Sequence, residues 1–485
     1  MKQVFYPKAT STGDISTEKG KPEANRYEFA GTGLQAFPIP FKLRDAKAIS
    51  VLNIAKELDL LAGQLTALHP KSVVLQWQNI QDANLRNILE TSGQNYELIK
   101  QRMIALQEEL DWEIYKCFGL SDLGASVEIL NNTEFGITSE LRPFLWESDI
   151  PPDSLPTAFP DVYQQRRKIL QSNPAIAIIE DLVFKRPWWG RQGVYGRLAQ
   201  DYAGWIQDAL MNWLLDRLET YFDFDGRMNN TDKPTNKIEI SITSIAKLTD
   251  IAKSDSQFIT VGELYRNDPA FKIEKLITEL VEAESVPHLP ILRYNPLGLR
   301  KRLEWEHTWE LQRQEDTPPR PPLEKGGGID SPPLQGGARG GSIPVPPKYA
   351  STDFLKPNYW RLRGKLDVPK ERWIAFPHCQ SEDGTLAIAW AGYNHLQLAQ
   401  TLSTYYIDIK ERIGGSNDPR LAPLLASLVE LIPWLKQWHN DIDPEFGLAM
   451  GDYYEGFLIE EAKAIGHTVE SLKAWEPVGK VKSKK

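Results

Sequence analysis

Basic and indole side chains gather at two places in the chain, and this combination of residue types could bind nucleic acid. Arg300, Lys301 and Arg302, which we call the first basic cluster, precede Trp305 and Trp309. Guanidinium and ammonium groups contact phosphates, and indole rings stack on bases. The first basic cluster is therefore a candidate DNA contact.

The second basic cluster has the same chemistry and consists of Trp360, Arg361, Arg363 and Lys365. An alternative interpretation is internal, because tryptophans often pack in cores and cations often pair with nearby acids. The neighbouring acids are Glu304, Glu306, Glu310, Asp367 and Glu371. The sequence leaves both interpretations open.

Other residues with catalytic chemistry fit structural roles better. Asp452, Glu461 and Lys463 have the residue types of a metal-dependent nuclease, but they lie in a segment with helical periodicity. His439 near Asp441 and Asp443 is more typical of a turn than of a metal site. We therefore expect no metal in this chain.

Composition limits the class of protein. The 485 residues are 41% hydrophobic and 25% charged, which is typical of a globular protein of about three domains. A net charge of −9 argues against indiscriminate coating of nucleic acid, so any DNA contact must be local. Cys117 and Cys379 are too few and too far apart for a disulfide framework or a zinc knuckle.

The apolar runs of the sequence are short, which limits the cellular compartments that we expect for the protein. We find no apolar run of membrane-spanning length and no charged-then-apolar leader at Met1. Neither membrane insertion nor secretion is expected, and we predict a cytoplasmic protein.

Hydrophobic periodicity predicts a mainly α, multidomain fold that opens with a long helical hairpin. Apolar residues at helical spacing from Ile49 to Leu65 predict one helix, with Pro70 just beyond it. A second helix is predicted after Gly93 and ends at Gly119, with a helical connection around 84–89. The two apolar stripes favour antiparallel packing.

The rest of the chain is predicted to be a helical middle region followed by an α+β C-terminal domain. The LAIAW run at 386–390 predicts a buried strand, and the stripe from Leu421 to Leu435 predicts a helix. A small strand–turn–strand element is expected between Tyr27 and Phe41. The predicted segments are an irregular start that includes the small β element (1–44), the helical hairpin (45–130) and the helical middle domain (131–316). They continue with a Pro/Gly-rich linker (317–342), the α+β C-terminal domain (343–477) and a basic tail (478–485).

Several runs resemble one protein family. The run IPVPPKYASTDFLKPNYWRLRGKLDVPKERWIAF, the WEHTWELQRQED stretch before it and the later WLKQWHNDIDPEFGLAMGDYYEGF run resemble the C-terminal part of PglX-type adenine-specific DNA methyltransferases of the Pgl/BREX phage-defence systems. The segment ALQEELDWEIYKCFGLSD also resembles the closing helix of target-recognition regions, at Leu110, Asp111, Tyr115, Phe118, Gly119 and Leu120. Packing and capping would explain that helix equally well.

The resemblance implies an enzyme that transfers a methyl group from S-adenosylmethionine to adenine N6. Such an enzyme needs a Gly-rich cofactor turn after a strand and an Asn-Pro-Pro-aromatic loop for the flipped base. Residues 29–33 imitate the first motif, but prolines at 38 and 40 follow where a helix should begin. Residues 295–298 lack the second proline and the aromatic residue. We therefore expect neither catalytic nor cofactor-binding residues in this chain.

The expected function is consequently DNA recognition and partner docking beside a separate catalytic methyltransferase portion. The partners implied by the resemblance are double-stranded DNA, that catalytic portion and other phage-defence proteins, with no membrane. The alternatives are a stand-alone protein-interaction module and a degenerate remnant, neither of which would bind DNA.

Overall fold

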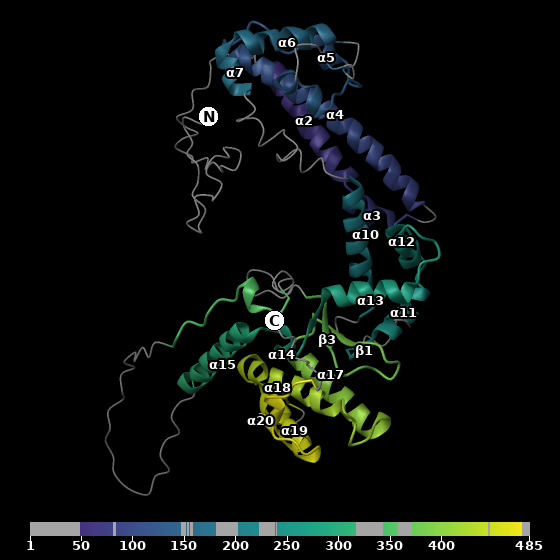
Figure 1. Cartoon of the computed structure of the whole chain (residues 1–485), viewed down its shortest axis with the longest axis vertical. Coiled ribbons are helices and arrows are strands. Elements are labelled where there is room, and N and C mark those ends of the chain that lie inside the picture. Colours follow the sequence, from purple (N-terminus) through teal and green to yellow (C-terminus); the bar gives the residue numbers. More distant parts are fainter. Residues whose placement is uncertain are drawn as a thin grey trace, which may run out of the picture. The chain divides into compact units, whose positions relative to one another are not determined.

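The computed structural model describes residues 49–80, 84–146, 159–180, 202–222, 240–316, 343–356, 371–444 and 447–477, together with residues 152, 155 and 238. The fold is mainly helical, as predicted, and the chain divides into two compact units, Met1–Trp213 and Leu214–Lys485 (Figure 1). The expected β element before residue 44, the linker 317–342 and the tail 478–485 lie outside the described residues.

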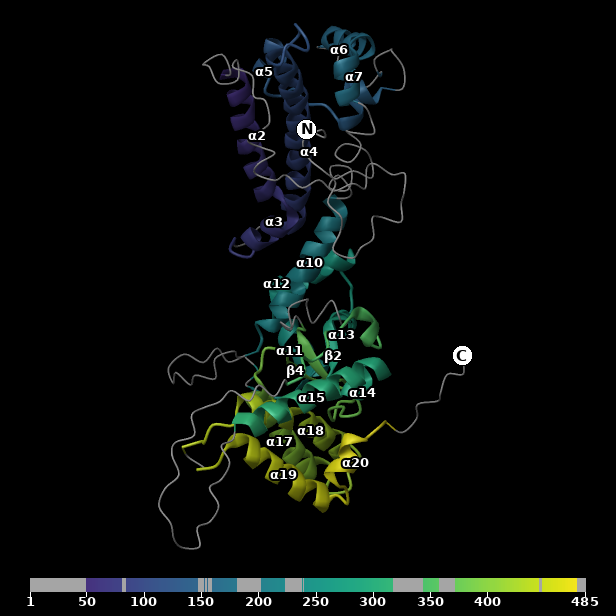
Figure 2. The same cartoon turned by 90° about the vertical axis from the view of Figure 1, so that its left-hand side faces the viewer.

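The first unit is built on a long helical hairpin, which confirms the prediction. Helix α2 (Ile49–Leu68) lies along α4 (Leu85–Cys117), and the short α3 (Pro70–Trp77) connects them (Figure 2). The predicted start of the second helix was wrong. The Asn84 side chain accepts a hydrogen bond from the Asn87 N–H at 3.2 Å and caps α4, so residues 84–89 open the helix rather than connect two helices.

Gly93 therefore lies inside α4, and packing explains why a glycine is present. A Cβ at this position would lie 3.0 Å from the ring of Tyr202, which packs across the helix. A glycine inside a helix normally signals a boundary, but here it allows close approach of an aromatic ring.

The predicted end of α4 at Gly119 is confirmed. Gly119 has φ +67°, and its N–H donates to the Lys116 carbonyl at 3.0 Å. The Leu120 N–H donates to the Tyr115 carbonyl at 2.9 Å. These two bonds form a Schellman motif, which satisfies the last carbonyls of the helix.

Shorter elements pack against the second half of α4. They are α5 (Val127–Asn131), the 3₁₀ turns η4 (Ser139–Leu141) and η5 (Pro143–Leu145), α6 (Pro160–Ser172) and α7 (Pro174–Glu180). Helix α10 (Tyr202–Glu219) follows, and the division between the two units falls within it. One apolar core of this region gathers Ile104, Phe135 and Tyr163.

Buried ion pairs hold this region together. Arg166 on α6 binds Glu109 on α4 through two hydrogen bonds of 2.7 and 2.6 Å, and neither side chain is exposed. The equally buried Arg142 binds Glu108 at 2.6 Å and Asp111 at 2.7 Å. Burial alone would lower the pKa of both arginines, but these carboxylates raise it above the usual value. The guanidinium groups therefore stay charged inside the unit.

The second unit contains a small mixed sheet. Its described strands are β1 (Thr243–Ser244), β2 (Ser285–Pro287), β3 (Trp373–Phe376) and β4 (Ala387–Trp390), in the order β1-β4-β3-β2. Strand β2 is parallel to β3, and the other pairs are antiparallel. The predicted strand at 386–390 is confirmed as β4. The middle region is mainly helical, as predicted, and it also contributes β1 and β2, which are too short for alternation to be visible in the sequence.

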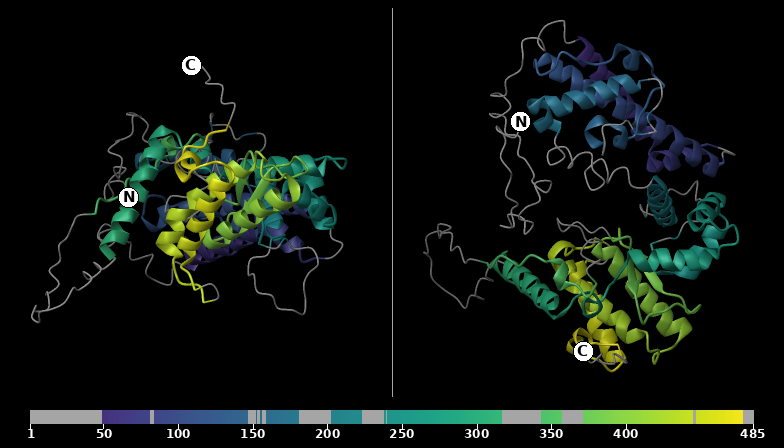
Figure 3. Two further views of the ribbon diagram at one scale, coloured as in Figure 1. Left: turned by 90° about the horizontal axis from the view of Figure 1, so that it is seen from below. Right: turned by 45° about the horizontal axis from the view of Figure 1, so that its top comes forward.

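Helices surround this sheet. Helices α11 (Ile245–Lys253), α12 (Ser256–Arg266) and α13 (Ile273–Glu284) precede β2, and α14 (Pro290–Arg293) and α15 (Pro296–Asp316) follow it. After the 3₁₀ turn η6 (Ser351–Asp353) and the β3–β4 hairpin come α17 (His395–Asp408), the π turn η7 (Ile409–Ile413), α18 (Leu421–Trp438), α19 (Met450–Ala464) and α20 (Val469–Lys473). Helix α18, which confirms the predicted leucine stripe, packs against α15, α17, α19 and α20 (Figure 3).

The buried Arg166–Glu109 pair predicts that two similar substitutions, Arg166→Met and Lys100→Met, differ strongly in their effect on the free energy of unfolding. Arg166→Met leaves Glu109 buried without its cation, which should lower the free energy of unfolding by about 3–5 kcal/mol. Lys100→Met removes an exposed pair with Glu97 (3.1 Å) and should change it by less than about 1 kcal/mol. Urea unfolding followed by tryptophan fluorescence measures both. Equal small costs would contradict a stabilising role for the buried pair.

Candidate functional site

Helix α15 carries the first basic cluster, and its start is fixed by hydrogen bonds. The Asn295 side chain accepts the Gly298 N–H at 3.0 Å, and Pro296 occupies the first helical position. The Asn295 N–H donates to the Asp353 carbonyl at 3.0 Å, and a Cβ on Gly298 would collide with that same oxygen. Residues 295–298, which imitate a methyltransferase loop in sequence, therefore form a helix cap.

The charge of Lys301 is neutralised within the unit. Its Nζ donates to Asp353 Oδ2 at 2.7 Å and to the Lys348 carbonyl at 2.9 Å. Asp353 has no exposed surface, and its Oδ2 also accepts the Ala350 N–H at 2.6 Å. Lys301 thus fastens α15 to the segment before η6.

Arg302 is also engaged internally. Its guanidinium binds Glu430 on α18 through Nε (2.9 Å) and Nη2, and it contacts Glu306 at 2.6 Å. Burial alone would lower the pKa of Arg302, but the Glu430 and Glu306 carboxylates raise it above the usual value. This forked pair connects α15 to α18.

Arg300 differs from its two neighbours. Its side chain is 70% exposed, and its contact with Glu304, at 4.0 Å, is long. Arg300 is therefore well placed to meet an external anion, whereas Lys301 and Arg302 would first have to give up their internal partners.

The two tryptophans of α15 pack rather than stand free. The Trp305 indole N–H donates to the Pro347 carbonyl at 3.1 Å. Trp309 is buried and meets Trp434 edge to face, with 4.5 Å between ring centroids. These contacts match the internal interpretation for the indoles of the first cluster. The second cluster, Trp360, Arg361, Arg363 and Lys365, lies outside the described residues, so its DNA contact stays a prediction.

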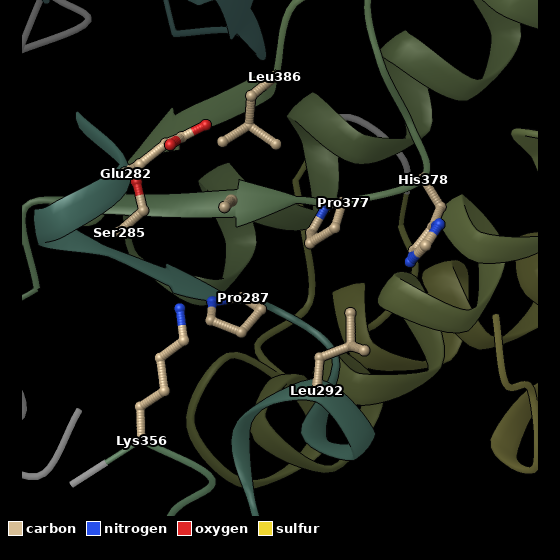
Figure 4. Close-up of a pocket in the computed structure, with 9 residues that line it drawn as sticks. Glu282, Ser285, Pro287, Leu292, Lys356, Pro377, His378 and Leu386 are labelled. Carbon is tan, nitrogen blue, oxygen red and sulfur yellow. The ribbon is translucent and has the colours of Figure 1, made fainter. Parts of the chain in front are cut away.

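A pocket of about 310 Å³ opens beside β2 and β3 (Figure 4). It is lined by Glu282, Ser285, Pro287, Leu292, Lys356, Ala375, Pro377, His378 and Leu386. Figure 4 shows Ser285 and His378 at opposite ends, so these two side chains do not form a nucleophile–base pair. The pocket offers apolar walls with charged groups at its edge.

Residues considered for other chemistry take structural roles. Glu461 accepts hydrogen bonds from the Tyr406 hydroxyl at 2.8 Å and from Lys410 Nζ at 2.6 Å, and it lies on the predicted helix. Among the described residues, no three histidine, cysteine, aspartate or glutamate side chains group as metal ligands would. Cys117 and Cys379 form no disulfide, and burial raises the pKa of the Cys379 thiol.

His288 is a buried titratable group behind the site. Its Nε2 lies 2.9 Å from the Ser427 carbonyl of α18, so the neutral ring donates its proton there. Burial, with help from the nearby positive charge of Arg293, lowers the pKa of His288 to about 3. Sequence periodicity did not indicate this residue, because its partner lies far along the chain.

Residues 147–485, which include α15, match a recognised family. A family model described as "Domain of unknown function (DUF7008)" matches residues 147–485, and the chain therefore belongs to this family. The chain is also 33% identical to the adenine-specific methyltransferase PglX of Streptomyces coelicolor, over 98% of this chain. It spans 37% of the length of that protein, which agrees with the predicted resemblance to a C-terminal part of a PglX-type protein.

No solved structure matches the chain. Within the described parts of the chain, no helix is both long and apolar enough to cross a membrane.

The buried imidazole predicts an acid-sensitive stability. The unfolded chain binds a proton at His288 near pH 6.5, whereas the folded chain resists it down to about pH 3. The free energy of unfolding should therefore fall as the pH drops below 6.5, by up to about 1.4 kcal/mol per pH unit. His288→Asn should reduce that slope in urea titrations at several pH values.

The exposed His378 provides the control, because Asn also tolerates its φ of +74°. His378→Asn should leave the pH slope of the original chain in place. If both variants show the same pH slope as the original chain, buried His288 is not the source of the acid sensitivity.

Proposed function

We propose that this chain is a DNA-recognition and partner-docking portion of a PglX-like, adenine-specific methyltransferase that acts in the cytoplasm in phage defence. The methyl transfer itself is carried out by a separate catalytic portion, which binds S-adenosylmethionine. The observation that carries this proposal is the alignment of 98% of this chain with 37% of PglX. The chain thus corresponds to one portion of a larger enzyme.

Two further observations support a role other than catalysis. Neither methyltransferase motif is recognisable in the sequence, and the imitation at 295–298 caps α15. Arg300 presents an exposed guanidinium on the same helix, which suits a phosphate contact. We assign the main described DNA contact to Arg300, with Arg361, Arg363 and Lys365 as further candidates.

A second candidate function is a protein-interaction module that does not touch DNA. The pairing of Lys301 with Asp353 and of Arg302 with Glu430 favours it, because these pairs leave less cationic charge for phosphates. Binding of unmethylated host DNA distinguishes the two functions. Salt-dependent binding supports the first, and absence of binding at low salt supports the second.

The division of labour is tested by methyl transfer from labelled S-adenosylmethionine. The purified chain alone should not methylate unmethylated host DNA, and a mixture with the catalytic portion of a PglX-like enzyme should do so. The control is the catalytic portion alone, which should be less active than the mixture. Methylation by this chain alone would overturn the proposal.

The exposed arginine predicts a specific defect in DNA binding. Arg300→Glu should weaken binding and lower the slope of log K against log salt by about 1 for the lost phosphate contact. Arg412→Glu is the matched control, since Arg412 is 76% exposed and pairs with an acid four residues away, Asp408. Fluorescence anisotropy over a range of salt concentrations measures both, and equal effects would remove Arg300 from the interface.

A further inference from the structure

The segment 343–350 is an extended coil whose conformation is set by proline. Figure 1 shows it as a green coil without a helix or an arrow. Pro344, Pro346 and Pro347 have φ fixed near −65°. Ile343, Val345 and Pro346 each precede a proline, which restricts them to extended backbone. The three prolines and the pre-proline restriction therefore favour a polyproline II conformation over 343–347.

The C-terminal end of this segment is anchored to α15. The Pro347 carbonyl accepts the Trp305 indole N–H at 3.1 Å, and the Lys348 carbonyl accepts Lys301 Nζ at 2.9 Å. Tyr349 stacks on Tyr294, with 5.3 Å between ring centroids. The C-terminal end of the segment is thus held against the rest of the unit by two backbone carbonyls and by the ring of Tyr349.

The remaining surface of the segment faces solvent. Val345 is 91% exposed, more than any other large apolar side chain among the described residues. A polyproline II helix has three residues per turn, so Val345 and Lys348 lie on one edge. Both are exposed, whereas Ile343 and Pro346 on the next edge are half-buried. On the third edge Pro344 is exposed and Pro347 is half-buried, so the edge that is exposed at both positions is the one that carries Val345 and Lys348.

We propose that residues 344–348 are a docking ligand for a protein with an aromatic-lined groove that carries a carboxylate. Such grooves bind preformed polyproline II helices at low entropic cost. Val345 would occupy an apolar slot between aromatic rings, and Lys348 would pair with the carboxylate. The contact between Trp305 and the Pro347 carbonyl shows the same chemistry inside this chain. The proposal does not depend on DNA binding or on methyl transfer.

The test uses a purified SH3 domain as the probe, because its groove is lined with aromatic rings and flanked by acids. Binding of the full chain is measured by titration and compared with that of a free peptide of sequence IPVPPKYA. The full chain should bind at least as tightly as the peptide, since its segment is already ordered. Binding by the peptide but not by the chain would show that the segment is covered, and would overturn the proposal.

Variants of the full chain make the test specific to the exposed edge. Val345→Asp and Lys348→Glu should each weaken binding at least about tenfold, and neither touches the carbonyl anchors. The matched controls are Val127→Asp, at another exposed valine, and Lys56→Glu, at another exposed lysine. Unchanged thermal unfolding confirms that each variant is folded. Equal losses in variants and controls, or no binding by either the chain or the peptide, would overturn the proposal.

Discussion

A guanidinium that is wholly or largely shielded from water must keep its carboxylate partner, and this constraint fixes helices in both units. In the first unit Arg166 is shielded from water on α6 and is matched by Glu109 on α4. In the second unit Arg302 on α15 is matched by Glu430 on α18. Removing Glu109 would leave the Arg166 charge in a low-dielectric interior, at a cost of several kcal/mol, whereas the Arg302–Glu430 pair is partly exposed and its loss would cost less. These helices therefore cannot slide along one another without separating the pairs, and each packing arrangement has one register.

The same pairs decide how a basic cluster should be interpreted. Three consecutive cations in the sequence suggest a surface of three positive charges, but two of them hold α15 in place. Lys301 and Arg302 direct their charges inward to Asp353 and Glu430, and this arrangement turns Arg300 outward. Local cation density in a sequence thus overstates the positive charge that a folded surface presents. The inward pairing of Lys301 and Arg302 also shows how internal ion pairs can position a neighbouring side chain, here Arg300, at the surface.

Sequence reasoning predicted elements where a single helix face or a local capping rule governs the structure. The stripes of α2, α4 and α18 and the end of α4 at Gly119 follow from such local rules. It missed features that depend on distant partners. Glu430 is remote in sequence from Arg302, and strands β1 and β2 gain their ladder hydrogen bonds from β4 and β3. Gly93 was wrongly interpreted as the boundary before the second helix, because its role depends on close packing against Tyr202, which no local pattern reveals. The exposure of Val345 likewise depends on which carbonyls α15 holds.

The mixed sheet also imposes an order on how the second unit can form during synthesis. Strand β2 ends at Pro287, but its parallel partner β3 begins at Trp373 and β4 at Ala387. At roughly 5–20 residues per second, the ribosome needs on the order of 5–20 s to deliver β3 after β2. During that interval β2 has no ladder to join, while α11 to α13, which are local in sequence, can already fold. Pro287 offers no N–H to a foreign strand, so the waiting strand is a poor template for misassembly on the ribosome.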